Sequence, residues 1–256
     1  IDMTKEWLFT WHVYGNNNNV SVNFGSQGFT YTPPSGFKAL CTENLSLNQT
    51  PTAIRPKKHF ETLLYTGTGS SNSITGLEFS PDLIWAKRRD TSGHHNLLID
   101  TIRGGSKSLQ ANTADPENSN ANRDMTFLSN GIRWNSDTGN ANANGGTYAV
   151  WCWKGGGAAV SNTDGSVTST VSANQEAGFS IVQFEAQTTS TNITVGHGLG
   201  KKPEFWMWKS IDSTIDWYNY HKDIGYNGWL NNSTTAAATT GNDAAWKAEP
   251  TSTVFT

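Results

Sequence analysis

The residues best suited to chemistry are a group of aromatic side chains in the last fifth of the chain. They are Trp217, Tyr218, Tyr220, His221 and Trp229. Aromatic ring faces can pack against the apolar C–H faces of sugars, while Tyr hydroxyl and Trp indole N–H groups hydrogen-bond to sugar hydroxyls. These five residues are therefore our candidate carbohydrate-binding residues.

A competing interpretation places part of this group in a hydrophobic core. Side chains alternate between the two faces of a strand, so Tyr218 and Tyr220 share one face while Trp217 and His221 share the other. We expect the two tyrosines to lie in the core. For Trp217 and His221, both a core position and a ligand-binding position stay open.

Catalysis by paired carboxylates has weaker support. Hydrolysis of a glycoside needs two carboxylates placed across the sugar. Several acidic residues recur at matching turn positions, which indicates capping or solvated turns, and no nucleophile elbow, phosphate-binding loop or HExxH motif is present. We expect a protein that is not an enzyme. The acidic residues considered are Asp82, Asp90, Asp100, Glu185, Glu204, Asp212, Asp216 and Asp223.

Metal and phosphate sites are also disfavoured. His94 and His95 are adjacent, and neighbouring residues of a strand point to opposite faces, so a solvent-exposed loop pair is expected. His197 lies in a glycine-rich segment without the following helix that an anion site needs, which favours a tight turn. The sequence predicts no metal and no cofactor.

Composition places these residues on strands. The chain has 256 residues, only 15% of them charged, with 25 glycines and many Asn, Thr and Ser residues. Asn and Gly favour turns, Thr favours strands, and strong helix formers are too few for long amphipathic helices. The expected fold class is all-β, with serial β-sandwich modules of jelly-roll or concanavalin-like type and little helix.

Charge, hydropathy and cysteine usage exclude several classes. A net charge of −3 gives no field to attract nucleic acid, and the apolar runs are of strand length, so we expect neither nucleic-acid partners nor membrane insertion. Cys41 and Cys152 have no metal-ligand spacing. Two buried free thiols are favoured over a disulfide.

An internal repeat organises most of the chain. Residues 60–65, 80–90 and 95–104 can be laid over residues 179–184, 202–212 and 216–225, at offsets close to 120 residues. In this alignment Leu97 and Ile99 stand where the second copy has Tyr218 and Tyr220.

The predicted domains follow from this repeat. They are the end of a sandwich at 1–45, a linker at 46–58, a first repeat at 59–157, a flexible linker at 158–177 and a second repeat at 178–256. Residues 253–256 match 125–128 of the first copy, and nothing matches the closing strand near Trp151. We expect the chain to continue beyond residue 256, or another chain to supply that strand.

Residues 22–45 carry a family resemblance. The sequence VNFGSQGFTYTPPSGFKALCTENL resembles the C-terminal end of a SPRY domain of bacteriophage virion proteins, with Ser26-Gln27 as a minor departure. The two copies that follow are similar to tandem domains of marine phage tail and fibre proteins. The matching signatures are residues 161–174, 178–182, 195–204, 216–218 and 220–222.

The resemblance implies a function but no catalytic residues. It implies a virion structural protein, a tail fibre or tail-associated adhesin at the exterior of the particle, that recognises host-surface glycans. It further implies self-association, with trimers usual for such fibres, and contacts with other tail proteins. The alternatives are a tailspike-like depolymerase that hydrolyses host polysaccharide, and a free lectin-like carbohydrate-binding protein.

Overall fold

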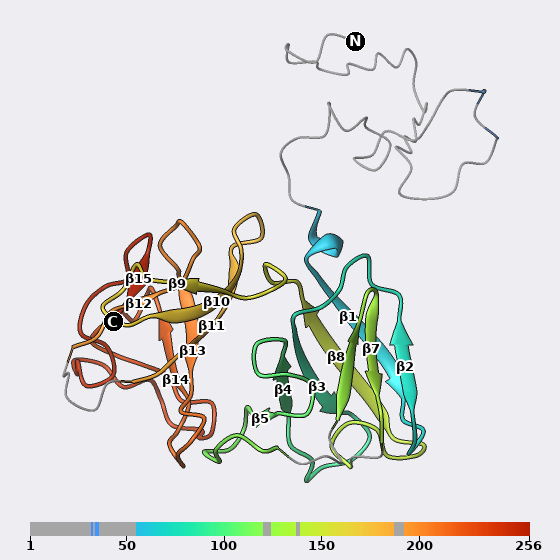
Figure 1. Cartoon of the computed structure of the whole chain (residues 1–256). Helices are drawn as coiled ribbons and strands as arrows, with labels where there is room; N and C mark the ends of the chain where they lie inside the picture. Colours follow the sequence, from blue (N-terminus) through green and yellow to red (C-terminus); the bar gives the residue numbers. More distant parts are fainter. Residues whose placement is uncertain (1–31, 33, 36–54, 120–123, 137–138, 187–191) are drawn as a thin grey trace, which may run out of the picture. The chain divides into compact units, whose positions relative to one another are not determined.

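The computed structural model describes residues 32, 34, 35, 55–119, 124–136, 139–186 and 192–256 (Figure 1). The chain divides into two compact units, residues 1–53 and 54–256. The SPRY-like end predicted at 1–45 lies almost wholly outside the described residues, as do Cys41 and the first part of the linker predicted at 46–58. The fold below is that of the second unit.

The described residues form an all-β protein, which confirms the predicted fold class. One short 3-10 turn, η2 (Pro56–Lys58), is the only helical element in the described ranges. All named strand pairs are antiparallel. A search of these ranges for a helix apolar and long enough to cross a membrane finds none.

Two sheets make up the first half. The larger sheet has the order β1-β8-β3-β4-β5 and the smaller one the order β2-β7-β6. The strands of the larger sheet are β1 (Phe60–Thr66), β8 (Thr147–Trp153), β3 (Leu83–Arg88), β4 (Leu97–Asp100) and β5 (Leu109–Gln110). Those of the smaller sheet are β2 (Asn72–Thr75), β7 (Gly131–Trp134) and β6 (Met125–Leu128).

The two sheets pack against each other through one apolar core. Ile84 on β3, Val150 and Cys152 on β8, and Ile132 and Trp134 on β7 are all fully buried there. Period-2 alternation puts these side chains on the inner faces. Cys152 is a free thiol, and its burial raises its pKa to about 12.

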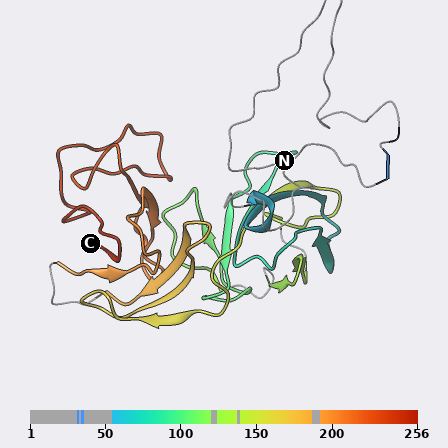
Figure 2. The ribbon, with the colours of Figure 1, turned by 90° about the horizontal axis from the view of Figure 1, so that it is seen from above.

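Shorter strands build the second half. They are β9 (Val160–Asn162), β10 (Ser169–Asn174), β11 (Phe179–Phe184), β12 (Val195–Gly196), β13 (Phe205–Trp208), β14 (Tyr218–His221) and β15 (Val254–Phe255). They pair in the order β11-β10-β9, with β12-β15 and β13-β14 as two further pairs. Figure 2 shows the same strands from above.

The segment 158–177, predicted as a flexible linker, contains two of these strands. β10 pairs with β11 along its whole length and with β9 on its other side. The prediction is wrong because small side chains are found in tightly packed strands as well as in linkers. Small residues also permit close packing: a Cβ at Gly165 would collide with the Thr194 carbonyl oxygen.

Strand pairing in the two halves follows the same pattern. Leu98 pairs with Leu109 in the first half, and Asn219 pairs with Leu230 in the second, each 121 residues further on. The predicted match of residues 253–256 with residues 125–128 has to be corrected. β15 pairs with β12 in the same way as β7 pairs with β2, so residues 253–256 correspond to β7.

The two halves pack directly on one another through the outer face of the larger sheet. Leu98 and Leu109 on that face form an apolar cluster with Trp217, and Met207 and Ile211 pack against it. The indole N–H of Trp217 donates to the Gln110 carbonyl at 3.0 Å. The halves are therefore joined by a core, which corrects the expectation of modules separated by a free connection.

His197, at the end of β12, is buried and gives a pH-dependent term to stability. Its ring accepts from the Leu199 N–H at 3.2 Å, and its other nitrogen lies 3.3 Å from the Thr251 carbonyl. Burial holds the pKa of His197 below its ordinary value, and the Thr251 contact and the Asp164 charge offset part of that effect.

We expect the free energy of unfolding to fall as the pH drops below about 6.5. In that range the unfolded His197 binds a proton that the folded ring resists, so the unfolded state carries more protons and stability rises with pH. Urea titrations of the wild type and of His197→Gln at pH 7.5, 6.5 and 5.5 test this. Equal slopes against pH in the two proteins would contradict the prediction.

Candidate carbohydrate-binding surface

Three aromatic side chains form a row on one face of the β13-β14 hairpin. Trp208 and Tyr218 are opposite each other in the hairpin register, with ring centroids 5.9 Å apart. The Trp229 ring lies 5.6 Å from that of Tyr218. We call these three residues the aromatic row.

The side chains of the aromatic row are partly exposed, and their polar groups are free to bind a ligand. All three side chains are half-buried. Within the described part of the chain, neither the Tyr218 hydroxyl nor the indole N–H groups of Trp208 and Trp229 have a hydrogen-bond partner. Such rings present apolar faces together with free polar groups, which is the combination that sugar stacking requires.

Polar side chains lie close to the row in sequence and register. The pairing of Asn219 with Leu230 places Asn231 opposite Tyr218, and the Asn231 Oδ1 atom is buried without a partner among the described residues. Lys209 follows Trp208 directly, and its ammonium group donates to the carbonyl of Ser210 at 2.7 Å. Burial lowers the pKa of Lys209.

Two of the five predicted binding residues are buried, so a binding role for them has to be corrected. Trp217 is 4% exposed in the core between the halves, and its ring has no face left for a ligand. Tyr220 is fully buried, stacks on Trp206 at 3.8 Å and donates its hydroxyl to Glu249 at 2.7 Å.

The other predicted residues divide between the two faces of the hairpin. Tyr218 and Trp229 belong to the aromatic row. His221 lies on the opposite face beside Phe205, and its ring accepts from the Asp223 N–H at 3.2 Å. Trp208 was missed by sequence reasoning, although its alternation with Trp206 and its place opposite Tyr218 were the signals that could have identified it.

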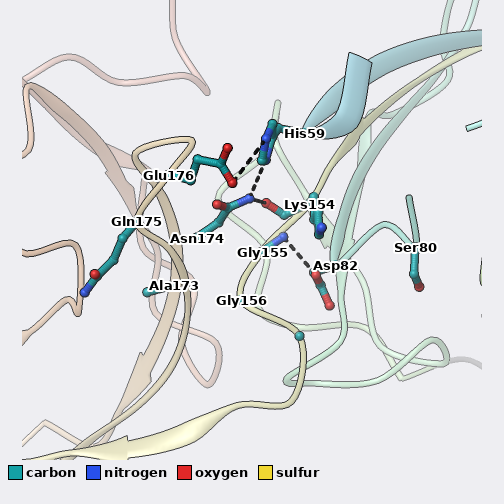
Figure 3. Close-up of a pocket in the computed structure, with 11 residues that line it drawn as sticks. His59, Ser80, Asp82, Lys154, Gly155, Gly156, Ala173, Asn174, Gln175 and Glu176 are labelled. Carbon is teal, nitrogen blue, oxygen red and sulfur yellow. Dashed lines mark hydrogen bonds and ion pairs between the residues drawn. The ribbon is translucent and has the colours of Figure 1, made fainter. Parts of the chain in front are cut away.

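A shallow pocket of about 390 Å³ lies between the first half and the end of β10 (Figure 3). It brings Asn174 together with His59, Asp82 and Glu176, three groups that could in principle move protons. The Asn174 amide lies 2.9 Å from the His59 ring and also donates to the Lys154 carbonyl. Glu176 lies 3.8 Å from the other ring nitrogen.

These groups are occupied in fixing the chain after β8. The Asp82 carboxylate accepts from the Gly155 N–H at 2.8 Å and from the Thr101 hydroxyl at 3.2 Å. The Gly156 N–H donates to Ser172 at 2.9 Å, and a Cβ at Gly156 would lie 2.5 Å from a backbone oxygen. Close packing therefore requires glycine at positions 155 and 156. We interpret the pocket as a structural contact between the two segments rather than as a reaction site.

Several other candidates for catalysis and metal binding have structural partners. Asp90 pairs with Arg88, Asp100 with Arg103 and Glu204 with Lys222. His94 and His95 are half-buried rather than exposed, and lie within hydrogen-bond distance of Arg88 and Asn112. Among the described residues no group of His, Cys, Asp and Glu could hold a metal ion.

Comparison with known protein families identifies the second unit. The sequence profile of a family described as a domain of unknown function, DUF7483, matches residues 55–256. The chain belongs to this family. The DUF7483 match is continuous across both halves, which also share the apolar cluster around Trp217. No curated protein and no solved structure matches the chain.

Proposed function

We propose that this protein is a non-catalytic component of a phage particle, a tail fibre or tail-associated adhesin that binds host-surface glycans. The observation that carries the glycan-binding part is the aromatic row. The particle location rests on the sequence resemblance of residues 22–45 and of both repeats to phage virion proteins.

The row suits weak binding to extended polysaccharides. The three tilted rings have neighbouring centroids about 6 Å apart, and each half-buried ring leaves only part of its surface for a ligand. Each ring that stacks on a sugar removes apolar surface from water, which contributes about 25 cal/mol per Å². Oligomerisation of such a fibre multiplies weak sites, so that avidity rather than single-site affinity secures attachment.

Replacing Trp229 by alanine should weaken glycan binding about tenfold, because one stacking ring and its free indole N–H are lost. The measurement is titration of the full chain with purified host envelope polysaccharide, followed by calorimetry or tryptophan fluorescence.

Tyr226→Ala is the matched control. Tyr226 is an exposed aromatic residue three positions from Trp229 that lies outside the row. Equal binding by all three proteins would reject the row as the site. Release of reducing ends from the polysaccharide would reject the non-catalytic assignment.

The particle location has a separate test. Antibody against the chain, visualised with immunogold on intact particles, should label the tail or its fibres. Labelling confined to the capsid, or no labelling of particles, would reject the assignment while leaving the glycan measurement unaffected.

A further inference from the structure

A carboxylate lies on the same face as the aromatic row, just before the start of β14. Asp216 precedes Tyr218 by two residues, and Ser233 follows Asn231, the residue opposite Tyr218, by two residues. The Asp216 Oδ1 atom accepts from the Ser233 hydroxyl at 2.7 Å. This hydrogen bond joins the two residues that the same register pairs, so Asp216 and Ser233 lie on the face of the row.

The Asp216 carboxylate keeps most of its hydrogen-bonding capacity. An ionised carboxylate can accept about four hydrogen bonds. Among the described residues, the Ser233 hydroxyl is the one hydrogen-bond donor to Asp216, and the Asp216 side chain is half-buried like the rings of the row. Two residues of a strand span about 7 Å. A polysaccharide that crosses the row at Tyr218 therefore also meets this carboxylate.

The loop between β13 and β14 carries more negative than positive charge. Its charged residues are Lys209, Asp212 and Asp216. The Lys209 ammonium donates to two backbone carbonyls of the same loop, at 2.7 and 3.1 Å. The charges of Asp115 and Asp216 act on this ammonium and offset part of the lowering of its pKa by burial. Lys209 is thus engaged by acceptors and carboxylates of the protein itself, and an anionic ligand would meet net negative charge.

We propose that Asp216 is a specificity-determining residue of the glycan-binding surface, and that the ligand is a polysaccharide without acidic groups. This inference rests on the proposed glycan-binding function. The carboxylate accepts from sugar hydroxyls beside the unit that stacks on the row, and hydrogen bonds to a charged acceptor are stronger than those between neutral groups. A uronic acid or a sulfated sugar brings acceptors and negative charge to the same position, so it is repelled.

The test titrates the full chain with two probes by calorimetry. The probes are the neutral and the acidic fraction of purified host envelope polysaccharide, separated by anion exchange. The wild type should bind the neutral fraction at least tenfold more tightly than the acidic one. Asp216→Asn keeps an acceptor for the Ser233 hydroxyl but removes the charge. It should weaken binding of the neutral fraction about tenfold and narrow the difference between the fractions.

Asp212→Asn is the matched control, because it removes the same charge from an exposed position in the same loop. It should bind the neutral fraction as the wild type does, and thermal unfolding checks that both variants are folded. Equal losses of affinity in the two variants, or no loss in either, would overturn the role of Asp216. Tighter binding of the acidic fraction by the wild type would overturn the ligand class and leave glycan binding intact. Binding of neither fraction would reject the proposed function itself.

Salt dependence separates charge repulsion from shape. The preference for the neutral fraction should shrink when sodium chloride rises from about 0.01 M to 1 M, because the screening length falls from about 30 Å to 3 Å. The affinity for the neutral fraction itself should change little, since its hydroxyls carry no charge. A preference that is independent of salt would overturn charge repulsion as the basis of the selectivity.

Discussion

Replacing Trp217 with alanine is expected to lower the free energy of unfolding by about 3–5 kcal/mol. Trp217 is 4% exposed and packs with Leu98, Leu109 and Ala111 on the outer face of the larger sheet. Truncation removes one of the largest side chains of the core between the halves. It also leaves the Gln110 carbonyl without the indole N–H that it accepts at 3.0 Å.

Denaturant unfolding monitored by circular dichroism gives the measurement. Trp229→Ala is the matched control, since it removes the same side chain from a half-buried position and should have a clearly smaller effect. A loss below 1 kcal/mol for Trp217→Ala would show that the two halves do not depend on this core for their stability.

Replacing Arg103 with alanine should also cost about 3–5 kcal/mol, because it leaves the buried Asp100 carboxylate without its cation and leaves Glu117 with Lys107 alone. Arg103 binds Asp100 at 2.6 Å, Glu117 at 3.2 Å and the Leu98 carbonyl at 3.2 Å, and its side chain is 7% exposed. The Glu117 N–H in turn donates to the Ile211 carbonyl, so the network lies beside the junction of the two halves.

Two further variants separate the contribution of charge pairing to stability from that of packing. A triple variant, Arg103→Met with Asp100→Leu and Glu117→Met, should recover most of the loss, because the only charge that it leaves unpaired is that of the exposed Lys107. Lys222→Ala, which breaks the exposed pair with Glu204, should leave stability nearly unchanged. If Arg103→Ala behaves like Lys222→Ala, the buried network is not a source of stability.

These two expectations illustrate where sequence reasoning succeeded and where it did not. Sequence spacing aligned Leu97 and Ile99 with Tyr218 and Tyr220, and the structure pairs the strands that carry them in the same pattern. The sequence leaves both a core position and a ligand-binding position open for Trp217. Alternation gives the face of the strand on which Trp217 lies but not what covers that face. Its partner Gln110 is 107 residues away in the chain.

The errors have the same origin. Gly, Ser, Thr and Ala dominate residues 158–177 and predict a linker there. β10 nevertheless forms in this segment because β11 and β9 pair with it on both sides. Asp82 is one of the carboxylates considered for catalysis, and in the structure it accepts from the Gly155 N–H instead. Both outcomes depend on neighbours that local composition does not reveal.

The sequence by itself determined the all-β class, the pattern of alternation and the offset of the repeat, because these follow from local propensity and period-2 geometry. The tertiary structure decided how far each aromatic side chain is buried. It buried Trp217 and Tyr220 and left Trp208, Tyr218 and Trp229 half-buried. Burial is a property of contacts between distant segments, and only the packed chain brings those segments together.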